Sequence, residues 1–212
     1  MKLALTLSIL FQLTLVSSSI FTILPKKYVD DIEKLFLKPK EHTTSEIAWF
    51  YNDYTASKDK DYLDRIKNNK HFFDSFQFTH IFYNMGKETS AHFGKIVKIL
   101  EDTKIQWKSI ERIKANLTTP LPNRKPGDIT VPHQDIRPNS DYYKNKKAIS
   151  IIYYVHNTDG DTIFYDDECK KIIKKVSPKK GRAVIFDSLI FHSYKRPMKS
   201  DKRVVINFIV NV

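Results

Sequence analysis

Hydrophobic residues in the first half of the chain recur at helical spacing in two places. Residues 25–37 and 90–100 each put their apolar side chains three or four positions apart. Because that spacing gathers them on one face, both stretches are predicted to be amphipathic helices. Residues 41–86 between them are rich in aromatic residues but show no clean period. Their four clustered phenylalanines are expected to belong to the core: Phe72, Phe73, Phe76 and Phe78.

From residue 110 the period of the apolar positions changes to two. Ile113, Ala115 and Leu117 alternate with polar neighbours, as on a strand with two unlike faces. Short β-rich runs follow at 149–155, 162–165, 172–176, 183–186 and 204–210, with turn signals at 157–160 and 178–181. Helices followed by many short strands predict one α+β domain over residues 1–212. Residues 20–105 would be its helical support region, and 106–212 a β-sandwich or barrel.

Composition narrows the class of protein. The chain has 212 residues, of which 41% are hydrophobic, which suits a folded domain. Its single cysteine, Cys169, excludes an intrachain disulfide framework and a cysteine-rich zinc module. The formal charge of +12 fits either a solubilising surface or an acidic macromolecular partner. Neither a zinc finger nor an RNA-binding signature accompanies that charge.

The first 19 residues allow two interpretations. One basic residue, an apolar stretch and three serines resemble a secretory signal peptide. The stretch is too short and too often interrupted by polar residues to be a stable membrane span. The other interpretation is a first β-strand, since residues 20–25 continue the apolar run without a spacer. We favour the strand, and with it a cytoplasmic protein over a secreted one.

Candidate metal ligands occur in two segments. His133 and Asp135 are two positions apart, so on an extended strand both side chains would project to one face. The pair alone is weak, because about half a His-x-Asp match is expected by chance at this composition. His192 follows an apolar strand and a polar residue, as a ligand at a barrel mouth would. Together the three would form the 2-His-1-carboxylate facial triad typical of non-haem iron.

Arg203 is the candidate for a binding residue next to that metal. It opens the apolar strand at 204–210, eleven positions after His192 (203 − 192). Residues 195–202 would form a turn that lets the two strands pair antiparallel and returns Arg203 toward the metal. It shares a strand face with Asn207, and that face should point inward. A guanidinium suits two parallel hydrogen bonds to a carboxylate, such as the one at the distal end of 2-oxoglutarate.

These residues, in this order, resemble the Fe(II)/2-oxoglutarate oxygenase superfamily, and most closely its prolyl-hydroxylase-like branch, including phage-type members. The likeness runs from about residue 110 to residue 212. Tyr153-Tyr154 resembles a Tyr-Tyr pair that members carry on the strand after the first ligands, and Gly160 and Thr162 resemble a Gly-Gly-x-Thr turn. The resemblance implies a double-stranded β-helix, a jelly-roll or cupin-like barrel, with the N-terminal helices packed on one sheet.

The same resemblance implies cofactors and further roles. His133, Asp135 and His192 would be both the catalytic centre and the ligands of Fe(II). Arg203, with Tyr154 and Asn116, would bind 2-oxoglutarate. O2 would be the second cosubstrate and ascorbate an auxiliary reductant. The reaction would couple decarboxylation of 2-oxoglutarate to hydroxylation of a substrate.

The substrate is the open part of this interpretation. A prolyl residue of a protein or peptide is the first candidate, and an acidic macromolecule such as a nucleic acid is another. Two different classes of protein remain as alternatives. One is a non-catalytic double-stranded β-helix that binds a metal or ligand. The other is a basic nucleic-acid-binding protein in which the His-Asp-His set is coincidental.

Overall fold

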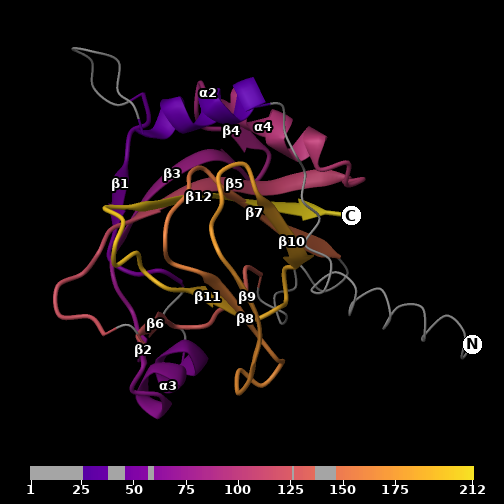
Figure 1. Cartoon of the computed structure of the whole chain (residues 1–212). Coiled ribbons are helices and arrows are strands. Elements are labelled where there is room, and N and C mark those ends of the chain that lie inside the picture. The colour runs from indigo at the N-terminus through magenta and orange to yellow at the C-terminus, as the bar shows by residue number, and fades with distance from the viewer. Residues whose placement is uncertain (1–25, 38–45, 57–59, 126, 137–146) are drawn as a thin grey trace, which may run out of the picture.

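A computed structural model describes residues 26–37, 46–56, 60–125, 127–136 and 147–212. Within them the largest element is a seven-stranded sheet, which we call the major sheet (Figure 1). Its central strand β12 pairs antiparallel with β5 on one side and β7 on the other. The strands in spatial order are β1 (Phe50–Asn52), β3 (Gln77–Asn84), β5 (Ser109–Thr118), β12 (Arg203–Asn211), β7 (Ala148–Tyr154) and β10 (Ala183–Asp187), with β4 (Lys87–Glu88) on β3.

A smaller sheet lies across from the inner face of the major sheet (Figure 1). It consists of β11 (His192–Tyr194), β8 (Thr162–Tyr165) and β9 (Ile172–Val176), all antiparallel. A parallel pair, β2 (Phe72–Phe73) and β6 (Ile129–Thr130), lies next to β11. From β7 to β12 the chain passes back and forth between the two sheets, with β7, β10 and β12 in the major sheet and β8, β9 and β11 in the smaller one. The fold is therefore the double-stranded β-helix that the sequence predicted, in a mixed α and β protein.

Helices cover the outer face of the major sheet. Both α2 (Lys26–Leu37) and α4 (Phe93–Asp102) pack there (Figure 1). Their apolar faces share one core cluster with Ile113 and Ala115 of β5 and Phe208 of β12. The third helix, α3 (Lys60–Asn68), lies at the far side of the molecule beside β2. Among the described residues, no helix is both long and apolar enough to cross a membrane.

Most predicted elements occur within a few residues of their expected bounds, but the aromatic segment differs. Of the four phenylalanines expected in the core, only Phe73 is buried, and the other three are half-buried. The segment instead contributes β3, whose Phe82 is fully buried under the helices. Without a regular period, the sequence did not indicate which aromatic side chain faces the core. The predicted signal peptide or first strand at residues 1–19 lies outside the described residues.

The segment between His192 and Arg203 also differs from the expectation. β11 pairs with β8 in the small sheet, whereas β12 pairs with β5 and β7 in the major sheet. The two strands are therefore not paired with each other, and residues 195–202 cross from one sheet to the other. Arg203 still returns to the metal candidates, because the two sheets face each other across the same cavity.

Asp159 fixes this crossing. Its carboxylate accepts hydrogen bonds from the backbone N–H groups of Met198, Lys199 and Ser200, at 2.7, 2.9 and 2.8 Å. Partial burial alone would raise the pKa of Asp159. The hydrogen bonds from these donors lower it by a larger amount, so the net pKa lies well below the usual range. The carboxylate therefore holds the backbone that leads into Arg203.

We expect Asp159→Asn to lower the melting temperature at pH 7, because the amide loses the charge that three N–H groups bind. A carboxyl whose pKa is depressed by folding stabilises above its unfolded pKa of about 4, and that contribution fades as the pH falls further. The difference in melting temperature between wild type and variant should thus shrink from pH 4 to pH 2. Asp167→Asn, at an exposed position, is the control. A difference independent of pH would contradict the prediction.

Candidate active site

A cavity with a volume of about 400 Å³ lies between the two sheets. Its lining includes every metal-ligand candidate and Arg203. The inner face of β12 contributes Arg203, Val205 and Asn207, as the alternation of that strand predicted. Most of the remaining wall comes from the inner face of β5, from β11 and from the segment around residue 134. Smaller parts come from β1 and the loop after it, β3, β7 and β8.

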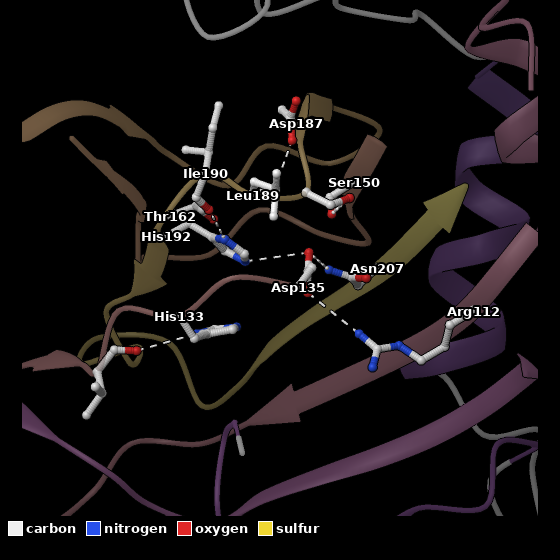
Figure 2. A network of polar contacts seen from close by, with 12 residues as sticks. Arg112, His133, Asp135, Ser150, Thr162, Asp187, Leu189, Ile190, His192 and Asn207 are labelled. Carbon is white, nitrogen blue, oxygen red and sulfur yellow. Dashed lines mark hydrogen bonds and ion pairs between the residues drawn. The ribbon is translucent and has the colours of Figure 1, made fainter. Parts of the chain in front are cut away.

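The His-Asp-His set converges in this cavity. One ligand atom from each of His133, Asp135 and His192 lies within 4.8 Å of the other two, a spacing that could hold a single metal ion. Figure 2 shows Asp135 between the two imidazoles, on the side of the major sheet. The segment around His133 is not a regular strand as expected. His133 instead forms an isolated antiparallel bridge with His192, with N–H to O distances of 2.9 Å in both directions.

Backbone carbonyl groups orient the two imidazoles. The Nδ1–H of His192 donates to the carbonyl of Ile190 at 3.0 Å, and Nδ1 of His133 lies 3.4 Å from the carbonyl of Val131. This arrangement leaves Nε2 of His192 facing Asp135, 3.7 Å from its Oδ2 (Figure 2). A backbone carbonyl that accepts from the other ring nitrogen and so fixes the tautomer is the usual support of a metal-binding histidine.

Electrostatics favour the metal-binding protonation states of His133 and Asp135. Burial, followed by the neighbouring His192, lowers the pKa of His133 to about 3, so its imidazole is neutral at physiological pH. Burial alone would raise the pKa of Asp135, but His192 and Arg112 outweigh it, and the net pKa is below the usual carboxyl range. Asn207 donates a hydrogen bond of 3.0 Å to the same carboxylate. A neutral His133 and an ionised Asp135 therefore face the same point as His192.

Arg203 is buried at one end of the cavity, 3% exposed. Its Nε donates to the carbonyl of Gly160 at 2.9 Å and its Nη2 to the hydroxyl of Thr162 at 2.9 Å. Gly160 has a φ of +108°, and a Cβ there would lie 2.6 Å from the carbonyl oxygen of Lys195, so the turn that supports Arg203 requires glycine. The guanidinium carbon also lies 4.8 Å from the ring centre of Tyr194.

Two hydroxyl groups near Arg203 lack partners. Thr118 is opposite Arg203 in the β5–β12 register, and both Thr118 and Tyr194 line the cavity. Among the described residues, neither buried hydroxyl has a hydrogen-bond partner. A buried O–H group that is left unpaired is costly, so this end of the cavity is built for an added acceptor.

The other two predicted cosubstrate contacts, Asn116 and Tyr154, differ in their position relative to the cavity. Asn116 lines the cavity, and its buried Oδ1 has no partner among the described residues. Tyr154 is fully buried, does not belong to the cavity lining, and donates its hydroxyl to Thr162 at 2.7 Å. Thr162 therefore stands between Tyr154 and the cavity. In this structure Tyr154 supports the partner of Arg203 and does not reach the space beside it.

Several lining residues were not singled out from the sequence. Thr118, Arg112 and Lys114 lie on the inner face of β5, in the polar half of the alternation seen at residues 112–117. The signal in the sequence was the alternation of polar and apolar residues, which is expected of a strand whose polar face lines the interior of a barrel. Thr162 and Tyr194 had no comparable signal, because their roles depend on how the small sheet faces β12.

Comparison with protein families bears on this geometry. Residues 122–211, which contain all three ligand candidates and Arg203, match the model of the 2OG-Fe(II) oxygenase superfamily. The match covers the part of the chain that carries the site. Together with the His-Asp-His geometry it supports a 2-oxoglutarate-dependent iron dioxygenase, whose cofactor is Fe(II) and whose cosubstrates are 2-oxoglutarate and O2. No match was found among curated protein sequences.

Solved structures share the fold at low sequence identity. An oxidoreductase of the 2OG-Fe(II) oxygenase family from Burkholderia pseudomallei is 8% identical, with a TM-score of 0.58 over 90% of this chain and 82% of its own. A prolyl-4-hydroxylase from Pseudomonas putida is 11% identical, with a TM-score of 0.55 over 93% and 97%. HygX from Streptomyces hygroscopicus, bound to nickel, 2-oxoglutarate and hygromycin B, is 9% identical, with a TM-score of 0.53 over 94% and 86%.

The residues of the cavity fit the groups that the matched superfamily uses. The His-Asp-His donor set suits Fe(II) and leaves positions of the metal open. The unpartnered hydroxyls of Thr118 and Tyr194, with the Arg203 guanidinium, suit one carboxylate. Both groups of residues line the same cavity, so a molecule could contact the metal at one end and Arg203 at the other.

Thr162 is expected to be essential for the shape of the Arg203 end. Thr162→Val keeps the size of the side chain but leaves the buried Tyr154 hydroxyl and Arg203 Nη2 without their acceptor. Such a loss costs about 1–3 kcal/mol, measured as the free energy of unfolding in a denaturant titration. Thr162→Ser keeps the acceptor and should cost clearly less. Equal losses for Val and Ser would show that the hydroxyl does not carry the effect.

Proposed function

We propose that this oxygenase is a hydroxylase in which His133, Asp135 and His192 hold Fe(II). The observation that carries the assignment is the convergence of their three ligand atoms within 4.8 Å inside the cavity. The electrostatics of the cavity support the assignment, since a neutral His133 and an ionised Asp135 are the forms that bind a cation. The bound metal and 2-oxoglutarate supply the activation of O2 that hydroxylation requires.

Arg203 is proposed to anchor the distal carboxylate of 2-oxoglutarate. Its support is the burial of a guanidinium whose Nη1 has no hydrogen-bond partner among the described residues, beside the free hydroxyls of Thr118 and Tyr194. A carboxylate there would satisfy all three groups. Thr162 and Gly160 hold the guanidinium in place, and Tyr154 holds Thr162. Asn116, further along the same wall, is proposed as an additional polar contact.

Peptidyl proline is the first substrate we propose to test. The resemblance of the motifs to the prolyl-hydroxylase-like branch supports this choice, and the fold shared with the Pseudomonas putida prolyl-4-hydroxylase is compatible with it. HygX, whose structure holds hygromycin B, shares the fold equally well, so the fold alone does not select a substrate.

We expect Asp135→Ala to abolish succinate release from 2-oxoglutarate in the presence of Fe(II) and ascorbate, because the metal loses its charged ligand. Asp167→Ala should match wild type. The same assay with proline-containing peptides should show the gain of one oxygen atom by mass spectrometry. If the Asp135→Ala variant released succinate at the wild-type rate, the metal assignment would be refuted. If wild type released succinate but oxidised no peptide, only the proposed substrate would be refuted.

Arg203→Ala is expected to raise the Michaelis constant for 2-oxoglutarate by about 30-fold or more. The loss of a partly buried, charge-assisted pair costs about 2–5 kcal/mol, and each 1.4 kcal/mol is tenfold. Iron affinity without the cosubstrate should change little, because Arg203 lies at the other end of the cavity. Lys202→Ala, next to it in sequence and paired with Asp201 at 2.8 Å, is the control. An unchanged Michaelis constant would require another anchor.

A further inference from the structure

The cavity contains a second pair of cations that the reaction as proposed does not use. Arg112 and Lys114 project from the inner face of β5, two positions apart, and both line the cavity. In the β5–β12 register Lys114 is opposite Asn207, whereas Thr118 is opposite Arg203. Lys114 and Thr118 are four residues apart along β5, which corresponds to about 13 Å at about 3.3 Å per residue. The pair therefore lies at the end of the cavity away from Arg203.

This end is also the side of Asp135. The Nη2 of Arg112 is 3.6 Å from Oδ1 of Asp135, and Asn207, opposite Lys114, donates to Oδ2 (Figure 2). A group held by the two cations would thus lie next to the metal centre, where a substrate must come. The distal carboxylate of 2-oxoglutarate would be held by Arg203 at the other end.

Within the described protein neither cation donates a side-chain hydrogen bond. Lys114 has no ion-pair partner there either, and burial, followed by the repulsion of Arg112, lowers its pKa to about 7, although Asp135 acts in the opposite direction. Arg112 forms an ion pair with Asp135 at 3.6 Å, but its buried Nε has no hydrogen-bond partner. One carboxylate thus lies beside two like charges, an arrangement that favours a further anion.

The charge of the cavity points the same way. Its described lining holds three cations, Arg112, Lys114 and Arg203, against one carboxylate, Asp135. With Lys114 protonated, the net charge is +2. Binding of Fe(II) and of 2-oxoglutarate adds opposite charges that cancel, so the loaded cavity keeps this excess.

We propose that Arg112 and Lys114 bind an anionic group, a carboxylate or a phosphate, of the substrate that this oxygenase hydroxylates. A role confined to holding Asp135 would explain Arg112 but would leave Lys114 without a function. The inference rests on the proposed function for the position of the metal and of 2-oxoglutarate. It also refines the peptide candidate: a peptidyl proline fits this cavity when an acidic group accompanies it.

The test uses the full-length protein loaded with Mn(II) and 2-oxoglutarate without O2, and two probes, inorganic phosphate and 13C-labelled acetate. Mn(II) is paramagnetic, so a probe bound beside it relaxes faster in 31P or 13C NMR. We expect fast relaxation of at least one probe with wild type. Lys114→Met should weaken its binding about tenfold or more, as the loss of a charge-assisted contact. The more tightly bound probe identifies the class of anion.

Controls separate the possible failures. Lys108→Met, at an exposed position before β5, should behave as wild type, and Lys114→Arg should restore binding. Affinity for 2-oxoglutarate, measured by calorimetry, should be the same in wild type and Lys114→Met. Equal probe relaxation in the two proteins, or none in wild type, overturns the anion site. A parallel loss of 2-oxoglutarate affinity in Lys114→Met also overturns it, because the lysine then serves the cosubstrate. Wild type that binds no 2-oxoglutarate contradicts the proposed function itself.

Discussion

The pairing of β12 with both β5 and β7 is the constraint on which the rest of this structure depends. All nine residues of β12 are buried, so the strand must be covered on both faces and paired at both edges. Its outer residues, such as Ile206 and Phe208, pack under α2 and α4. Its inner residues are then fixed toward the cavity. Arg203 and Asn207 thereby contact the two ends of the site from one rigid strand.

The site is organised by the contrast between the two faces of the major sheet. The outer face is apolar and closed by helices, which supplies the burial that stabilises the fold. The inner face of β5 is polar, with Arg112, Lys114, Asn116 and Thr118 aimed at the space between the sheets. Several of these polar atoms lack partners in the protein, a cost that bound ligands can offset. The stability of the fold and the reactivity of the site thus come from opposite faces of the same strands.

The two cationic regions of the cavity are supported in different ways. Arg203 is held by Gly160, Thr162 and the Tyr194 ring, so its guanidinium is positioned before any ligand binds. Lys114 has no such hydrogen bonds, and burial lowers its pKa to about 7. Under the proposed function, the positioned guanidinium of Arg203 binds the cosubstrate that the superfamily shares. The less restrained Lys114 binds the substrate that is particular to this chain.

Local pattern was enough to predict the elements with a clear period: the helix at Lys26–Leu37, the strands β5, β7, β8, β9, β10 and β12, and the inward face of Arg203. The His-x-Asp spacing and the isolated His192 also pointed to residues that do converge. Tertiary structure alone decided the rest. It placed β11 and β12 in opposite sheets, put Thr162 between Tyr154 and the cavity, and brought Tyr194 to Arg203. The physical reason is that periodicity records which face of a strand is buried, whereas the identity of the facing strand depends on how the sheets pack across the cavity.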